Sequence, residues 1–220
     1  MILINITSYN REKKLINLVE QLEGVDIKVW DDCSDFKIEY SYKWDNKTTF
    51  YRFSENYGLR NCWRKFKRIF EELQETDYKY FIFLPDDVIV CDDFVNIVVE
   101  IWESIEDEEK ISLSFSSVKR CEKPNWTGYE AHKVGNVIKT QWNDLMFICE
   151  KRFFQEVDIE EVSKERWNNK LNLGSGVGSQ ISNKLNNKGF SMYNISEDLV
   201  KHIGNNDSKM NPKQRKKTKL

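Results

Sequence analysis

The chain has 220 residues, 40% of them hydrophobic, which is enough for one large domain with a packed core and argues against global disorder. Its 34 basic and 36 acidic residues leave a formal net charge of −2, so we expect no nucleic-acid partner. The five cysteines form no Cys-x-x-Cys pair, which disfavours a zinc site and a disulfide framework and indicates a reducing compartment. The apolar opening at 1–6 is too short for a signal peptide or a membrane span, and we expect a cytoplasmic protein.

The first half of the chain alternates apolar strand-like runs with amphipathic helical segments. Short runs of β-branched and aromatic residues predict buried strands, and apolar residues at helical spacing predict helices. We expect strands at 1–6, 25–30, 48–53, 80–84 and 111–115, and helices at 11–22, at 59–73 and from an Asp92 cap to Trp102. This alternation is typical of an α/β fold with a mostly parallel sheet and helices on both faces.

The second half is less regular. We expect a loop with short strands at 120–140, an apolar run at 144–149 and a helix from Lys151, then a polar surface loop at 158–178, a helix at 179–187 and a strand at 190–195. Residues 206–220 are rich in lysine and arginine. They predict a solvated tail or linker, with weak contact to an anionic membrane surface as the alternative.

Polar clusters come directly after four of the predicted strands. They lie at 7–11, 31–35, 56–61 and 85–87. Ligands of an open α/β sheet bind beyond the carboxyl ends of its strands, so clusters that gather at one edge predict a binding site.

The residue types suit a nucleoside diphosphate with a metal ion. Tyr9 can stack on a base, and Asp32 can accept a hydrogen bond from the ring N–H of a uracil-like base. Asp86 can bind ribose hydroxyls, and Asp87 can hold Mg²⁺ or Mn²⁺, which prefer oxygen ligands. A metal there would act as a Lewis acid toward the departing diphosphate.

The order of these motifs resembles that of the GT-A-fold glycosyltransferases, and most closely the large inverting family 2. The motifs read Thr-Ser-Tyr-Asn-Arg at 7–11, Asp-Asp-x-Ser at 31–34, Asn-x-Gly with a following Arg at 56–60, and Phe-Leu-Pro-Asp-Asp-Val at 83–88. The resemblance covers about 1–105 well and the remainder loosely. It implies a single Rossmann-like GT-A domain over 1–205, with a nucleotide-binding half at 1–105 and an acceptor-side half at 106–205.

The resemblance also implies roles for individual residues. It assigns binding of the nucleotide sugar to Thr7, Tyr9, Arg11, Asp32, Asn56, Arg60 and Asp86. Asp87 would be the metal-ligating aspartate of the "DxD" motif. Pro85 stands where the Glu-Asp-Asp variant of that motif has an acid, so one usual ribose or metal contact is missing.

A second match lies at 198–204, where Asp-Leu-Val-Lys-His-Ile-Gly looks like the Ser-Leu-Val-x-His-x-Gly closing segment of related enzymes. The resemblance implies that His202 is a further metal ligand, and a purely structural histidine is the alternative. The other histidine, His132, is expected in a surface loop.

The catalytic base has a less direct signal. Inverting transfer needs a carboxylate that takes the proton of the acceptor hydroxyl. The segment 173–180, where the family often has an acid, contains none. We predict Asp144 as the base, at the start of the apolar run, with Glu150, Glu160, Glu161 and Glu165 as alternatives.

The predicted function is metal-assisted, hexosyltransferase-like transfer of a sugar from a nucleotide-diphosphate donor to a glycan, lipid-linked or protein-linked sugar acceptor. A UDP-sugar is favoured, with guanine and thymidine donors left open. Inversion is what the family implies, and retention stays open. A nucleotidyltransferase would need a glycine-rich triphosphate loop after the first strand, which 8–14 lacks. A catalytically inactive nucleotide- or glycan-binding GT-A domain is the second alternative, suggested by the missing acid.

Overall fold

The computed structural model describes residues 1–115, 132–134, 137–143, 145–161, 176–195 and 199–203. The candidate base Asp144, its alternative Glu165 and the basic segment 206–220 lie outside this set. The main sheet has nine strands in the order β3-β2-β1-β4-β9-β6-β10-β8-β7. Their bounds are β1 Ile2–Ser8, β2 Asp26–Asp31, β3 Thr48–Arg52, β4 Tyr80–Pro85, β6 Lys110–Ser114, β7 His132–Val134, β8 Val137–Thr140, β9 Phe147–Glu150 and β10 Ser191–Ile195.

The sheet is mostly parallel. β1 pairs in parallel with β2 and β4, β2 with β3, and β6 with β10. β9 and β8 run against their neighbours, so the other strands share one direction. The carboxyl ends of β1, β2 and β4 therefore meet at one edge.

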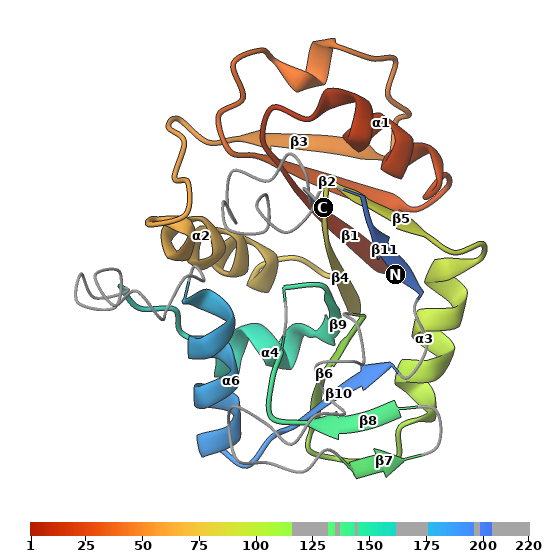
Figure 1. The fold of residues 1–220 in the computed structure, drawn as a ribbon, viewed down its shortest axis with the longest axis vertical. Coiled ribbons are helices and arrows are strands. Elements are labelled where there is room, and N and C mark those ends of the chain that lie inside the picture. The colour runs from red at the N-terminus through yellow and green to blue at the C-terminus, as the bar shows by residue number, and fades with distance from the viewer. Residues whose placement is uncertain (116–131, 135–136, 144, 162–175, 196–198, 204–220) are drawn as a thin grey trace, which may run out of the picture.

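Helices cover both faces of this sheet, as predicted (Figure 1). The helices are α1 Glu12–Glu20, α2 Cys62–Gln74, α3 Phe94–Ser104, α4 Lys151–Glu156 and α6 Val177–Asn187, with a short 3-10 turn at Ile38–Tyr40. Side chains of α1 and α3, such as Leu15 and Val98, share one core layer with Ile4 of β1. Side chains of α2, α4 and α6 share a second core layer with Leu3, the adjacent residue of β1. The two layers result from the alternation of side chains along a strand. No helix in the described part of the chain combines the length and the apolar character needed to cross a bilayer.

Two predicted helix starts are corrected. The helix expected from residue 59 begins at Cys62, because the backbone first forms a turn in which Asn61 N–H donates to Tyr57 O at 3.2 Å. Asp92 does not cap α3. The N-cap is Asp93, in a left-handed conformation with φ 56°, and its side chain accepts from Asn96 Nδ2 at 2.6 Å rather than from the helix backbone.

A second sheet was not predicted. It pairs β5, Val88–Val90, antiparallel with β11, Val200–His202. Strands of three residues are too short to show a period in the sequence. This sheet brings a segment near residue 200 beside the end of β4 (Figure 1).

Candidate functional site

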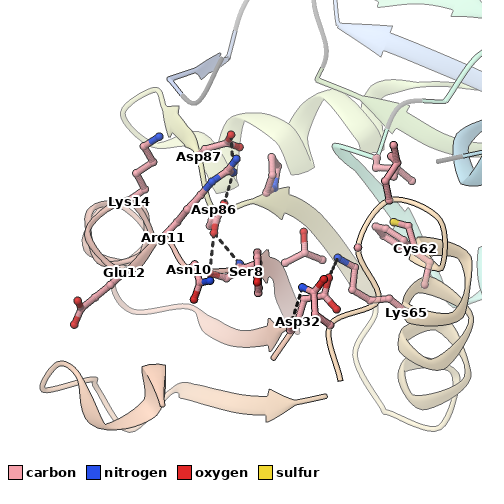
Figure 2. Close-up of a pocket in the computed structure, with 18 of the residues that line it drawn as sticks. Ser8, Asn10, Arg11, Glu12, Lys14, Asp32, Cys62, Lys65, Asp86 and Asp87 are labelled. Atoms are coloured by element: carbon pink, nitrogen blue, oxygen red, sulfur yellow. Dashed lines mark hydrogen bonds and ion pairs between the residues drawn. The ribbon is translucent and has the colours of Figure 1, made fainter. Parts of the chain in front are cut away.

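A cavity of about 870 Å³ opens at the carboxyl ends of β1, β2 and β4 (Figure 2). All four polar clusters contribute to its lining, together with Leu145, Met146 and His202. The described residues that line it are Thr7, Ser8, Tyr9, Asn10, Arg11, Glu12, Lys13, Lys14, Asp32, Phe36, Asn56, Gly58, Leu59, Cys62, Lys65, Phe66, Pro85, Asp86, Asp87, Leu145, Met146 and His202.

The parallel ladder itself brings the clusters together. Thr7 is in register with Pro85, and Ser8 with Asp31. One residue further along, Asp86 N–H donates to Thr7 O at 3.1 Å and Asp32 N–H donates to Ser8 O at 2.9 Å. The strand ends thus fix Asp32 and Asp86 on either side of β1.

Asp31 supports the site from outside the cavity lining. Its Oδ1 accepts from Ser34 N–H at 3.0 Å, and its Oδ2 accepts from Arg52 Nη1 at 2.8 Å. Burial raises the pKa of the Asp31 carboxyl, and the Ser34 hydrogen bonds and the Arg52 charge oppose this rise. Ser34 Oγ in turn accepts from Asn10 N–H at 2.8 Å, which ties the loop after β2 to the loop after β1.

Asp86 is almost fully buried, with 2% exposure. It accepts hydrogen bonds from Ser8 Oγ at 2.7 Å and Tyr9 N–H at 3.2 Å on Oδ2, and from Arg11 Nη1 at 2.9 Å on Oδ1. Burial raises the pKa of the Asp86 carboxyl, while the Arg11 charge and the Ser8 hydrogen bond act against that rise. Oδ2 already accepts two hydrogen bonds, whereas Oδ1 accepts one from Arg11, so Oδ1 is the oxygen that can accept from a ligand hydroxyl.

Asp87 lies between a guanidinium and an imidazole. Its Oδ2 is 2.7 Å from Arg11 Nη1, and its Oδ1 is 3.5 Å from His202 Nδ1. The second sheet sets this geometry, because His202 is in register with Val88 and Ile203 N–H donates to Asp87 O at 2.9 Å. The fold therefore places His202 next to Asp87 at the cavity.

Asp32 is buried as well, and it is held by the third cluster. Its Oδ1 accepts from Tyr57 N–H at 3.0 Å, and Asn56 Nδ2 donates to its backbone oxygen at 2.9 Å. Its Oδ2 lies 3.4 Å from Lys65 Nζ. Asn56 thus lines the cavity and also braces the loop that carries Asp32.

Lys65 is a site residue that sequence reasoning missed. It is only 7% exposed, on the buried side of α2. The signal was available: Lys65 lies four residues before Ile69, on the apolar stripe of that helix, where a lysine needs a partner.

Several predicted residues lie elsewhere. Arg60 is exposed and does not line the cavity. Glu150 is in register with Tyr80, at the opposite end of β4, and accepts from Trp102 Nε1 at 3.0 Å. Glu160 pairs with Lys184 at 3.0 Å away from the cavity, and Glu161 is exposed.

The neighbours of Asp144 are described and do reach the site. Asn143 is fully buried, and Leu145 and Met146 line the cavity. Acidic side chains among the described lining residues are Glu12, Asp32, Asp86 and Asp87.

The side chains at this cavity fit a metal ion whose coordination is completed by the phosphates of a bound substrate. Over the residues placed by the structure, no group of three His, Cys, Asp or Glu side chains lies close enough to hold an ion alone. Mg²⁺ and similar ions are commonly bound by one or two protein groups plus substrate phosphates. Asp87 and His202 provide two such groups facing the same cavity.

Comparisons with known proteins show the fold. No protein-family profile matches the chain. The curated relatives are Protein SEY1 from strains of Saccharomyces cerevisiae, 25% identical over 162 residues, which are 74% of this chain and 20% of theirs. The chain thus spans about a fifth of the length of the curated relatives it matches.

Solved structures match over most of the chain. S. aureus TarS, residues 1–349, superposes with a TM-score of 0.54 at 14% identity, covering 90% of this chain and 59% of TarS. The galactosyltransferase LgtC, in complex with donor and acceptor sugar analogues, gives 0.52 at 13% identity over 84% of this chain and 70% of LgtC. A mycobacterial protein gives 0.55 at 10% identity over 92% of this chain and 67% of that protein. The chain has a GT-A-like glycosyltransferase fold, as its motif order predicted.

Proposed function

We propose that this protein is a glycosyltransferase that moves a sugar from a nucleotide-diphosphate donor, with UDP favoured, to a glycan, glycolipid or protein-linked sugar acceptor. The observation that carries the proposal is the convergence of Asp32, Asp86 and Asp87 in one cavity at the carboxyl edge of a GT-A-like sheet. Ligands of such sheets bind at this edge.

The chemistry of these groups suits the donor side. Asp32 accepts the ring N–H of the base, and Lys65 beside it can donate to a neighbouring carbonyl. Tyr9 offers a ring for stacking, Asp86 accepts from ribose hydroxyls, and Arg11 lies where it can reach the phosphates.

Asp87 and His202 would hold Mn²⁺ or Mg²⁺ together with the donor phosphates. When bound, that ion supplies positive charge that stabilises the departing diphosphate. Arg11 lines the same cavity and can add a second positive charge at the phosphates.

On the acceptor side we assign the base to Asp144. Leu145 and Met146, which follow it in the sequence, line the cavity, and this closeness in the sequence supports the assignment. Asp144 would take the proton of the acceptor hydroxyl as that oxygen attacks the anomeric carbon, and attack from the face opposite the diphosphate inverts the configuration.

A direct test compares wild type with Asp87→Asn by thermal melting with UDP, GDP and dTDP, with and without Mn²⁺. A nucleotide at about 100 times its Kd adds roughly 2.7 kcal/mol, which raises Tm by several degrees for a domain of this size. We expect a Mn²⁺-dependent shift with UDP in wild type and in the control Asp77→Asn, whose side chain is exposed, and a much smaller one in Asp87→Asn. A chain that no nucleotide stabilises would refute the donor site.

The second candidate is a binding domain without turnover. The described acidic lining lies on the donor side, at α1, β2 and β4, which is the observation that favours it. Release of UDP from a panel of UDP-sugars separates the two functions. Binding with no release from any donor and acceptor pair favours the binding domain, and release that Asp144→Asn abolishes favours transfer.

A further inference from the structure

Arg11 occupies the two carboxylates that the proposed donor would use. One nitrogen, Nη1, lies 2.9 Å from Asp86 Oδ1 and 2.7 Å from Asp87 Oδ2 (Figure 2). The Asp side chains are 2% and 6% exposed, and that of Arg11 is 20% exposed. Two adjacent buried carboxylates repel each other and are costly to desolvate, so the guanidinium serves as their counter-ion.

This pairing conflicts with a divalent cation at Asp87. An ion on Asp87 would either compete with Arg11 for Oδ2 or lie beside its positive charge, and like charges at such distances in a buried site repel strongly.

The Arg11 side chain can move without a change in the fold. Its backbone is fixed at the start of α1, where Arg11 O accepts from Lys14 N–H at 3.1 Å and from Leu15 N–H at 3.0 Å. Its long side chain lines the cavity, and a guanidinium binds phosphate oxygens in the same two-pronged manner as carboxylates.

We infer that Arg11 is a displaceable counter-ion: it neutralises Asp86 and Asp87 and transfers to the donor diphosphate when a divalent cation takes Asp87. The inference rests on the proposed function for the identity of the diphosphate. Its consequence is coupling. The nucleotide draws Arg11 away and so tightens metal binding, and by linkage the metal tightens nucleotide binding by the same factor.

The test measures the Kd of Mn²⁺ from the signal of free Mn²⁺ in electron paramagnetic resonance, with and without UDP. In wild type we expect UDP to tighten Mn²⁺ binding by a factor in the range of about 5 to 150. In Arg11→Met we expect tighter Mn²⁺ binding without UDP, by roughly tenfold or about 1.4 kcal/mol. We also expect a smaller coupling factor than in wild type, because only the phosphate ligands of the ion, and no longer the displacement of Arg11, link the two ligands. Arg11→Lys keeps one positive charge, so its Mn²⁺ affinity should lie between those of wild type and Arg11→Met. This variant preserves the test if Arg11→Met does not fold.

Lys67→Met is the matched control. The Lys67 side chain is 43% exposed and does not line the cavity, so this variant removes an equal charge outside the candidate site. We expect its Mn²⁺ affinity to equal that of wild type. Unchanged or weaker Mn²⁺ binding by Arg11→Met and Arg11→Lys without UDP would overturn the inference, as would a gain in Lys67→Met of the same size as in Arg11→Met.

Measuring Mn²⁺ binding both with and without UDP distinguishes failure of this inference from failure of the proposed function. Tighter Mn²⁺ binding by Arg11→Met without UDP supports the counter-ion role even if no nucleotide binds, a result that counts against the proposed function alone. If UDP binds and its sugar is transferred while Mn²⁺ binds none of the variants, the proposed transfer stands and the displacement of Arg11 is overturned.

Discussion

At Asp32, two donors meet one buried carboxylate. Tyr57 N–H reaches Oδ1 and Lys65 Nζ faces Oδ2, so the side chain is oriented before any ligand arrives. A carboxylate held in this way loses little conformational entropy when it accepts a further hydrogen bond. We therefore expect Lys65 to contribute both to the stability of the fold and to binding of the nucleotide base by Asp32.

Replacing Lys65 with Met removes the positive partner of a buried charge while keeping the length of the side chain. We expect a loss of about 1–3 kcal/mol in the free energy of unfolding, together with weaker UDP binding. Lys67→Met is the control on the same helix, because the Lys67 side chain is 43% exposed and its pair with Asp158 is 3.6 Å long. Denaturant unfolding checks both variants, and equal losses in the two would argue against a special role for Lys65.

The residues at the strand ends were predictable from the sequence, because the segments that leave the carboxyl ends of parallel strands meet at one edge of the sheet. Tyr9, Asp32, Asp86 and Asp87 all line the cavity. Arg60 was harder to place, since a turn before α2 leaves it exposed. Lys65 was missed because a lysine within a strong apolar stripe was assigned to the helix pattern rather than to a partner.

At the scale of elements, Asn143 connects β6 with α6 beside the cavity. Asn143 Nδ2 donates to Ser112 Oγ at 2.7 Å, its Oδ1 accepts from Ser114 Oγ at 3.4 Å, and its N–H donates to Ser182 Oγ at 2.9 Å. This network fixes Asn143, two residues before Leu145 of the cavity lining.

Asn143→Ala should therefore lower the free energy of unfolding and also disturb the cavity lining at Leu145 and Met146. We expect a loss of about 1–3 kcal/mol, because the variant leaves buried hydroxyl groups without their amide partner. Asn96→Ala is the control, since Asn96 is exposed and its side chain donates a hydrogen bond to Asp93, three residues earlier on the same helix end. Thermal or urea unfolding measures the difference, and a neutral Asn143→Ala would show that the network does not contribute.

Asp107 links three other elements. It accepts hydrogen bonds from Tyr193 Oη of β10 at 2.6 Å and from Lys139 Nζ of β8 at 3.3 Å, and it lies in the turn before β6. Burial disfavours its charged form, but these hydrogen bonds outweigh burial and hold the pKa of Asp107 well below its ordinary value.

The depressed pKa of Asp107 fixes the sign of the resulting pH dependence. The folded state binds the proton more weakly than the unfolded state, so the contribution of Asp107 is present above its unfolded pKa of about 3.9 and is lost as pH falls. We expect Asp107→Asn to be less stable than wild type at pH 7 and to lose less stability between about pH 5 and pH 3. Unfolding curves across this range check the prediction, and parallel curves for the two proteins would contradict it.

At the scale of the whole molecule, the chain returns to the site through β11. Val200 is 8% exposed and packs into the core layer of α1 and α3. This return could not be derived from periodicity, and only the resemblance of 198–204 to a closing segment pointed to it. The mostly parallel sheet, by contrast, was predictable from the alternation of strands and helices over the first half of the chain.

Truncation tests this organisation and the predicted boundary near residue 205. Removing residues 199–220 should lower Tm, since burial of a side chain such as Val200 contributes about 1.5–3 kcal/mol, and should weaken Mn²⁺ binding through the loss of His202. Removing only 206–220 should leave both quantities unchanged. If the shorter truncation is as damaging as the longer one, the predicted domain boundary is wrong.

The pairing of β11 with β5 also sets the order in which the site can be completed. Asp87 leaves the ribosome early, while its neighbour His202 is made more than a hundred residues later. A nascent chain can form β1, β2 and β4 and bring Asp32 and Asp86 together well before this second half of the candidate metal pair exists. An incomplete translation product that stops before residue 202 would thus contain Asp32 and Asp86 but lack His202, one of the two proposed metal ligands.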